Sequence, residues 1–234
     1  FQTFLDYLYD NKDEVVALVR DADRRTLVRG MSPSPGGFAV EFESQPIDYR
    51  ITIEGYEMEV AAGAGGRGRA RPTQTLRTYP DVPYLADWAP TRTVPWPNGY
   101  LITVQDEAII DKLLQHGIAV ERLTDPESLT VDQFKPSEVA GAASLNQGHY
   151  TTSVTGEYST VEREFPAGTL FVTTAQALGA VATSLLEPES DDGLVVWNYF
   201  DRYLGAQWGG PLQAFPVFKL RAPVSLVTEG VGGS

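Results

Sequence analysis

Cysteine is absent from this 234-residue chain, and histidine occurs only twice. The absence of cysteine excludes disulfides, thiolate metal sites and cysteine nucleophiles. The two histidines, His116 and His149, do not stand in an HxxE or HExxH spacing, so the sequence offers no recognisable zinc-binding motif. No run approaches 18 consecutive apolar residues, and we therefore expect no membrane span.

Basic residues are also scarce, since 18 Lys and Arg stand against 31 Asp and Glu and the net charge is −13. A surface of that sign repels phosphate backbones, which argues against nucleic acid as a partner. Apolar residues make up 42% of the chain and aromatic residues 11%, enough for a real core. The length allows one large domain or one and a half.

Several catalytic signatures are missing. There is no GxSxG or SxxK motif for a serine hydrolase, and the Gly-rich stretch 63–68 is not a GxGxxG loop. Glu121 or Glu157 as a third zinc ligand beside the two histidines is a weak alternative, as is a hydrolase that combines His149 with an acidic cluster. In the same Gly-rich region, the alternating arginines at 67, 69 and 71 suit a solvated loop better than a grip on an acidic partner.

The N-terminal part is expected to contain a helix and then strands. Residues 1–30 show helical apolar spacing that ends near Arg25, as one amphipathic helix or a helix pair. Its uncapped start at Phe1 resembles the end of something longer, a truncated domain. Within 31–60 we predict strands at 38–44 and 49–60. Residues 61–97 form a Gly- then Pro-rich connector, with a mobile loop at 61–72 and an extended stretch packed through Trp88 and Trp96.

The remaining residues, 98–234, are predicted to form an α/β domain. A strand at 99–104, a helix ended by Gly117 and a strand at 118–123 suggest parallel strands with a right-handed crossover. Strands at 151–165 and 169–173 precede a helix that Thr174 caps and Pro188 ends. Residues 193–204 read as a short helix or a buried strand, and 215–227 as extended chain. The fold class is therefore mixed α/β (α+β), β-rich, with a strand-helix-strand unit and a few helices.

Four acidic residues follow the predicted helix in the stretch LLEPESDDG: Glu187, Glu189, Asp191 and Asp192. Their spacing departs from the calcium-loop pattern, and acids within one turn rarely face each other across a glycosidase cleft. We interpret the stretch as a polar connector, in which Ser190 or Asp191 caps a following helix and the acids are solvated.

The acidic stretch lies within a longer segment that resembles a known protein family. The run Leu185–Asp201, with FPAGTLFVTTAQALGAVATS before it, resembles a region C-terminal to the catalytic domain of bacterial zinc carboxypeptidase-like metallopeptidases, of the carboxypeptidase A type. Pro90–Leu123 and Phe215–Leu220 are similar to other parts of that region, and Phe4–Thr26 resembles the helix that follows the family's catalytic glutamate strand. The resemblance therefore extends over nearly the whole chain.

The resemblance implies a parent protein that hydrolyses peptides from the C-terminus with zinc held by a His-x-x-Glu pair and a later His. None of these residues, nor the family's arginine clamp, tyrosine and glutamate, can be placed here. We therefore assign no catalytic or metal-binding residue and no cofactor to this chain. It is expected to be a non-catalytic accessory domain whose partner is the parent's peptidase domain, with residues 1–30 as the last helix of that domain.

The resemblance favours a periplasmic or secreted location. The alternative is a free-standing binding or assembly protein with no enzymatic parent. The residues before Phe1 would distinguish the two.

Overall fold

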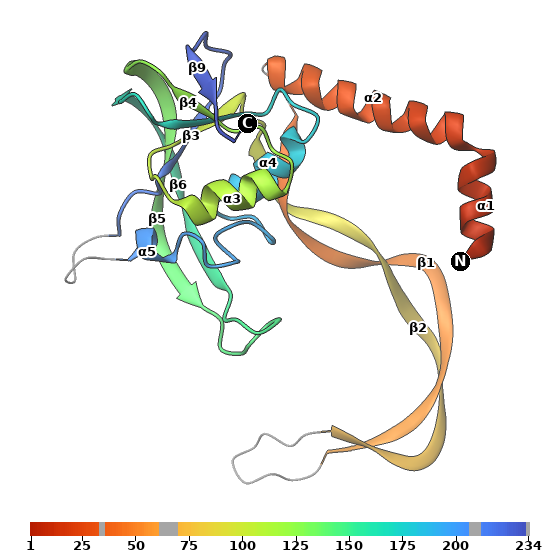
Figure 1. Cartoon of the computed structure of the whole chain (residues 1–234). Coiled ribbons are helices and arrows are strands. Elements are labelled where there is room, and N and C mark those ends of the chain that lie inside the picture. Colours follow the sequence, from red (N-terminus) through yellow and green to blue (C-terminus); the bar gives the residue numbers. More distant parts are fainter. Residues whose placement is uncertain (33–35, 61–69, 206–211, 233–234) are drawn as a thin grey trace. The chain divides into compact units, whose positions relative to one another are not determined.

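The computed structural model describes residues 1–32, 36–60, 70–205 and 212–232 (Figure 1). The chain divides into two compact units. The larger unit consists of Phe1–Glu41 and Arg92–Ser234, and the smaller unit is Phe42–Thr91. The predicted α/β domain, 98–234, lies entirely in the larger unit.

The larger unit is built on a seven-stranded sheet of order β6-β5-β8-β3-β7-β4-β9. Every neighbouring pair in it is antiparallel. Its strands are β3 (Gly99–Ile102), β4 (Glu121–Leu123), β5 (Glu127–Gly141), β6 (Thr152–Phe165), β7 (Leu170–Thr173), β8 (Val217–Leu220) and β9 (Thr228–Gly230). The β-rich α+β class predicted from the sequence is thus confirmed.

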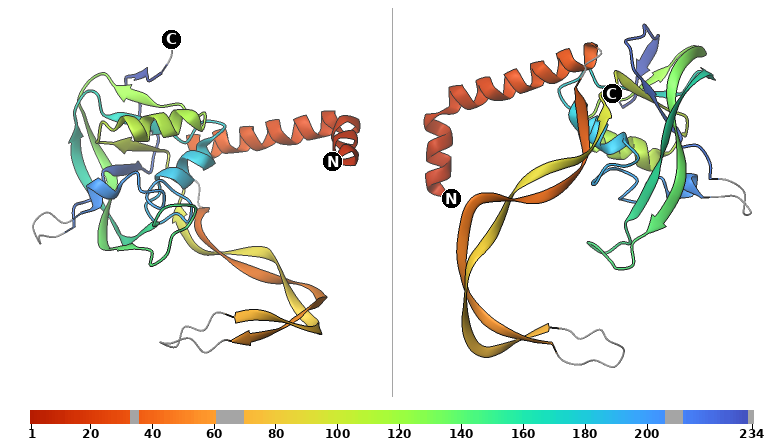
Figure 2. Two further views of the ribbon diagram at one scale, coloured as in Figure 1. Left: turned by 60° about the horizontal axis from the view of Figure 1, so that its bottom comes forward. Right: turned by 180° about the vertical axis from the view of Figure 1, so that it is seen from behind.

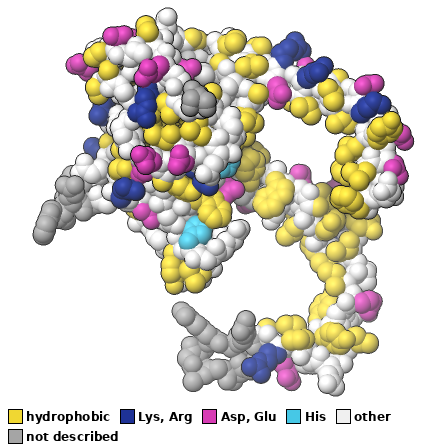
Figure 3. All heavy atoms as spheres, in the orientation of Figure 1, with side chains coloured by type: hydrophobic (Ala, Val, Ile, Leu, Met, Phe, Trp, Pro, Cys, Tyr) yellow, Lys and Arg dark blue, Asp and Glu magenta, His cyan; other side chains and the backbone are white. Residues whose placement is uncertain are grey.

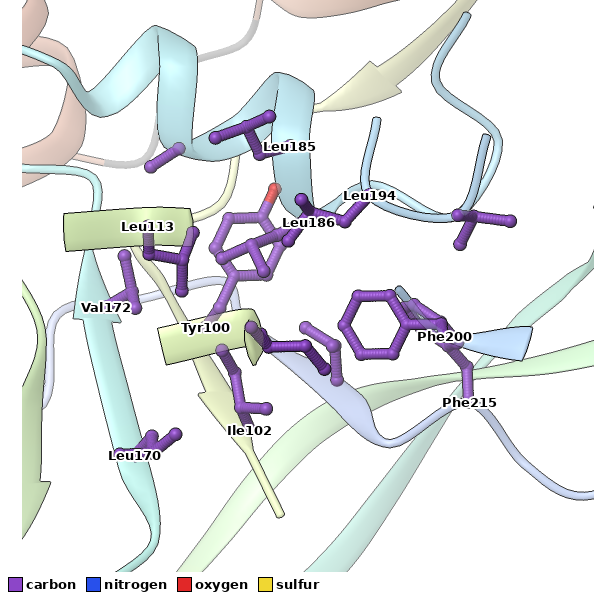
Figure 4. Packing of buried hydrophobic residues seen from close by; sticks show 14 of the residues in the cluster. Tyr100, Ile102, Leu113, Leu170, Val172, Leu185, Leu186, Leu194, Phe200 and Phe215 are labelled. Atoms are coloured by element: carbon purple, nitrogen blue, oxygen red, sulfur yellow. The ribbon is translucent and has the colours of Figure 1, made fainter. Parts of the chain in front are cut away.

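Two helices cover one face of this sheet, α3 (Glu107–Gln115) and α4 (Gly179–Leu186) (Figure 2). The strands send every second residue to this face, as the pleat requires. Figure 4 shows Tyr100 and Ile102 of β3 among leucines from both helices, with the Tyr100 hydroxyl directed toward the end of α4. Phe200 and Phe215 extend the same apolar cluster.

The intervening residues of the strands form a second, smaller cluster on the opposite face. Leu101, Phe171 and Phe218 come from three adjacent strands and pack together there. Phe165 meets Phe218 edge to face, with ring centroids 5.3 Å apart. The central strands are therefore buried on both sides, which explains why their sequences are continuous apolar runs.

The predicted strand-helix-strand unit is present, with one difference in topology. Asp106 caps α3 by accepting a hydrogen bond from the backbone N–H of Ala108, and Gly117 ends the unit's helix with a φ of 75°. Strands β3 and β4 run in the same direction, but β7 lies between them and is antiparallel to both. The predicted adjacent parallel pair was wrong, because a strand from later in the chain fills the space.

Two local predictions elsewhere in the larger unit were also wrong, and a third, the short helix or strand at 193–204, is confirmed only in part. Strand β5 was missed, and its alternation of buried and exposed residues is interrupted at Val131 and Asp132, which are both buried. Thr174 does not cap α4, since its hydroxyl donates instead to the carbonyl oxygen of Pro97, at 2.7 Å. Residues 193–200 form turns, and only Asp201–Leu204 is helical, as α5.

Of the two N-terminal alternatives, one helix or a helix pair, the structure has the pair, α1 (Gln2–Asp10) and α2 (Lys12–Met31). The second helix runs beyond the expected end near Arg25. The last turn of α2 adjoins the sheet, where the Asn98 side-chain amide donates to the Gly30 carbonyl. The Arg29 guanidinium lies 4.2 Å from the centre of the Trp96 ring. No helix in the described ranges is long and apolar enough to cross a membrane.

Strands β1 (Gly37–Val60) and β2 (Ala70–Pro95) pair with each other, and the smaller unit, Phe42–Thr91, contains most of both. We call this unit the β-ribbon; the start of β1 and the end of β2 belong to the larger unit. The two strands predicted at 38–44 and 49–60 are one continuous strand, because the residues between them also pair. Thr78 donates across the ribbon to Glu54 at 3.0 Å. The expected packing of Trp88 was wrong, since it is 64% exposed, whereas Trp96 is buried.

The predicted mobile loop falls mostly outside the described residues, which include neither Arg67 nor Arg69. Arg71 lies within β2. The mobile loop at 61–72 therefore stays a prediction.

Gly156 of β6 provides a test of the packing of β5 against β6. A Cβ at this position would overlap the Lys135 carbonyl oxygen and lie 2.7 Å from Cζ of Phe134. We expect Gly156→Ala to lower the free energy of unfolding by about 1–3 kcal/mol through overpacking. Gly141→Ala on β5 is the matched control, because a Cβ there meets nothing within 4 Å. Equal denaturant midpoints for the two variants would contradict this account of the packing.

Candidate functional site

The acidic stretch after α4 is divided between the interior and the surface. Glu187 and Glu189 are buried, whereas Asp191 and Asp192 are exposed. The prediction that all four acids are solvated was therefore wrong for the first two. Pro188 ends the helix as expected, but the chain then runs along the sheet, and the first two carboxylates enter its helix-covered side.

Glu187 is the centre of a buried polar network. Its Oε1 accepts a hydrogen bond from the Tyr100 hydroxyl at 2.7 Å, and its Oε2 accepts one from Tyr158 at 3.0 Å. The same Oε2 lies 2.8 Å from Nζ of Lys219. The ammonium also sits 3.7 Å from the centre of the Tyr158 ring. Strands β3, β6 and β8 thus each contribute one partner to a carboxylate that follows α4.

Burial shifts the pKa values of the three side chains that contact Glu187. Desolvation first, and the Glu187 carboxylate second, raise the pKa of Tyr100 well above its ordinary value. The pKa of Tyr158 rises for the same two reasons. Desolvation lowers the pKa of Lys219, while Glu187 acts in the opposite direction by favouring the ammonium. Both phenols therefore remain hydrogen-bond donors to the carboxylate at neutral pH.

Glu189 ties the same stretch to other parts of the larger unit. It forms an ion pair with Arg92 of β2, and its Oε1 accepts a hydrogen bond from the Gly156 backbone N–H at 3.2 Å. Burial raises the pKa of Glu189, and the arginine and the N–H partly offset this. Two residues later, the Asp191 N–H donates to the Val40 carbonyl at 2.9 Å. These bonds hold β1, β2 and β6 against the stretch.

The network leaves little room for a substrate. A cavity of about 50 Å³ borders it, with Tyr158 and Lys219 in its wall. Asp132, on the same cavity, pairs with Arg221 and accepts from the Thr160 hydroxyl at 2.8 Å. The space suits a few waters and is far below the volume of about 300–1,000 Å³ that small-molecule sites have. We therefore interpret the network as a fastening between α4 and the sheet.

The two histidines lie in different surroundings. His116 follows α3, and its Nδ1 is 2.8 Å from the Lys112 carbonyl oxygen. His149 Nδ1 is 2.6 Å from Oδ1 of Asn198, and its ring stacks on Trp197. His149 Nε2 is buried without a hydrogen-bond partner among the described residues.

The weaker alternatives gain no support from these positions. In the described part of the chain, no group of three or more His, Asp or Glu residues is placed to hold a metal ion. Glu121 accepts a hydrogen bond from Thr228 at 2.8 Å, and Glu157 lies opposite Lys135 in the sheet. The hydrogen-bond partner of His149 is the Asn198 amide rather than a carboxylate of the acidic stretch.

Sequence reasoning missed Lys219, Tyr100 and Tyr158. Lys219 did carry a signal, because it is the only charged residue within the apolar strand FPVFKL. A charged residue in a buried strand requires a buried partner of opposite sign. The two tyrosines carried no comparable signal, since a tyrosine is common in any strand.

Comparison of this chain with protein-family models, curated proteins and solved structures finds no match. The assignment of a function therefore depends on the chain itself.

The Glu187–Lys219 pair should contribute strongly to stability. Glu187→Gln leaves the buried ammonium unpaired, and we expect a loss of about 3–5 kcal/mol in the free energy of unfolding. Lys219→Met leaves the buried carboxylate without its cation and should cost about as much. The double variant should cost less than the sum of the two, because it leaves no charge unpaired. Asp192→Asn, on the exposed end of the stretch, is the control and should change stability by about 0.5 kcal/mol or less. Additive effects in urea unfolding would show that the two groups do not interact.

The raised pKa values of Tyr100 and Tyr158 predict weakening at high pH. Unfolded tyrosines ionise near their ordinary value of 10.0, whereas these two stay protonated while folded. Their contribution is complete below that pH and is lost as pH rises above it. Lys219 has the opposite effect on the free energy of unfolding, because its pKa is lower in the folded state and its contribution to stability rises with pH. With two groups against one, stability should fall above pH 10.0, and Tyr100→Phe should make the decline shallower. A wild-type stability that is constant across this range would contradict the prediction.

Proposed function

We propose that this chain is a non-catalytic accessory region of a zinc carboxypeptidase-like metallopeptidase, and that it packs on the peptidase domain of the same protein. Zinc would belong to that peptidase domain and not to this chain. The observation that carries the proposal is the unburied apolar side of α1. This helix lies within residues 1–30, which the resemblance assigns to the last helix of the catalytic domain.

Helix α1 has an apolar side, yet none of its residues is buried. Phe4 and Tyr7 are 61% and 64% exposed, and Leu5 is exposed as well. Figure 3, drawn in the orientation of Figure 1, shows hydrophobic atoms along α1 and α2. An amphipathic helix normally places its apolar side against another surface. A folded domain in contact with α1 would supply that surface.

The resembling segments also coincide with the framework of the larger unit. Pro90–Leu123 contains β3, α3 and β4, and Leu185–Asp201 contains the acidic stretch. Phe215–Leu220 contains β8 and Lys219. Three members of the Glu187 network, Tyr100, Glu187 and Lys219, thus lie within the segments that carry the resemblance, whereas Tyr158 lies outside them. A shared framework is what an accessory domain of one family would retain.

The β-ribbon favours the alternative, a free-standing binding or assembly protein. It exposes Tyr49, Leu76, Leu85 and Trp88. A two-stranded ribbon is marginally stable alone, so contact with another protein would stabilise it. This observation fits a module that binds partners with or without a peptidase parent.

The coding sequence before Phe1 is the first test. We expect a peptidase-sized segment with a His-x-x-Glu pair and a later histidine. A different kind of domain, or a start codon next to Phe1, would reject the peptidase parent and favour the assembly protein.

A surface variant tests the contact itself. Phe4→Asp should change the stability of this chain alone by about 0.5 kcal/mol or less, because the side chain is exposed. In a protein that includes the peptidase segment, the same change should increase amide hydrogen exchange in α1, since it places a charge in an apolar contact. Asp10→Asn, also on α1, is the matched control and should leave exchange unchanged. Identical exchange in α1 for the two variants would argue against packing through this face.

A further inference from the structure

A cavity of about 320 Å³ lies in the larger unit, away from the Glu187 network. Its volume is at the lower end of the range for small-molecule sites, about 300–1,000 Å³. Leu185 and Leu194 contribute a buried apolar base. Two aromatic residues and three polar ones complete the lining: Trp197, Tyr199, Lys112, His116 and Asp192.

Trp197 is held rigidly while it stays 37% exposed. Its ring stacks on His149, with centroids 4.6 Å apart and an interplanar angle of 24°. Its indole Nε1 donates to Oδ1 of Asp192 at 2.5 Å. Both contacts fix the ring before any ligand arrives, which lowers the entropy lost on binding.

The residue after Trp197 strengthens this support. Asn198 adopts a φ of 67°, a left-handed conformation that is uncommon outside glycine. Its side chain bonds His149 Nδ1 at 2.6 Å and donates to the Tyr150 carbonyl at 3.0 Å. The turn thus orients both rings of the stack. The hydrogen bonds of Asn198 therefore hold the turn beneath an exposed tryptophan in one conformation.

The polar groups of the cavity have defined hydrogen-bonding roles. The Nδ1 of His116 faces the Lys112 carbonyl oxygen, which only accepts, so Nδ1 carries the proton and Nε2 is an acceptor in the neutral ring. The carboxylate of Asp192 is also an acceptor. The ammonium of Lys112 is a donor, and it lies 5.8 Å from the centre of the Tyr199 ring. The cavity therefore presents two acceptors, one donor and two aromatic rings.

These groups select the chemistry of a ligand. Lys112 and Asp192 carry opposite charges, so a simple anion or cation would meet attraction from one and repulsion from the other. Hydroxyl groups both donate and accept, and they suit all three polar side chains. The carbon–hydrogen face of a sugar ring is apolar and matches the surface of an indole.

We propose that this cavity binds a pyranose unit, with its apolar face on Trp197 and its hydroxyls bonded to His116, Asp192 and Lys112. The proposal is independent of the peptidase parent. The same ring chemistry occurs in a free monosaccharide and in a glycan chain, and the experiment separates these two sources.

The test is saturation-transfer NMR on the whole chain, followed by titration calorimetry for any sugar that responds. The probes are the methyl glycosides of glucose, galactose, mannose and N-acetylglucosamine at millimolar concentration, and the matching linear trisaccharides. Binding of a methyl glycoside alone would identify a free sugar as the ligand, and tighter binding of a trisaccharide would identify a glycan. Both results support the site.

Two variants locate the binding. Asp192→Asn keeps an oxygen for the Trp197 indole but loses the charge, and it should weaken affinity at least about tenfold, because hydrogen bonds to charged groups are the stronger ones. Trp197→Leu should abolish detectable binding. Trp88→Leu, on the exposed β-ribbon, is the matched control and should bind as the wild type does. Asp192→Asn keeps the test decisive if Trp197→Leu does not fold.

Three outcomes would overturn the proposal. The first is the absence of saturation transfer for every sugar. The second is binding that both cavity variants retain. The third is binding of benzoate, an aromatic anion probe, in the absence of any sugar binding.

Discussion

The burial of one carboxylate constrains the larger unit more than any other interaction. Glu187 is 1% exposed, and its two oxygens receive Tyr100, Tyr158 and Lys219. An ionised group in such a place is stable only with partners, so α4, β3, β6 and β8 must meet at one point. Apolar packing by itself tolerates small shifts of a helix over a sheet. Bonds with defined directions do not, and they specify where α4 ends.

The residues that follow Glu187 in the acidic stretch contact other parts of the larger unit. The Asp191 backbone bonds to the start of β1, Glu189 pairs with Arg92 near the end of β2, and Asp192 accepts a hydrogen bond from the Trp197 ring. A short acidic segment thus connects the interior of the unit with a cavity on its surface. This arrangement explains why four acids stand so close together in a chain with no metal-binding motif.

The exposed apolar side chains of α1 and of the β-ribbon are not part of the core of the larger unit. The buried cores of the larger unit are complete on both faces of the sheet. The side chains of α1 and of the β-ribbon lie outside these cores. Large exposed apolar surface is characteristic of proteins that contact other proteins. A contact surface and a small-ligand cavity are compatible, because separate elements form them.

The sequence by itself determined the elements whose signals are local. Helix α3 followed from its apolar spacing, with Gly117 as its end, and the strands near β3, β6 and β7 followed from β-branched and aromatic runs. Only the tertiary structure decided that β7 separates β3 from β4 and that Trp88 is exposed. It also decided that Glu187 and Glu189 are buried, whereas Asp191 and Asp192 are not. Spacing along a chain records which residues share a face, but burial of a charge depends on partners that are distant in sequence. Lys219 lies 32 positions after Glu187 in the printed chain, and no local pattern relates the two.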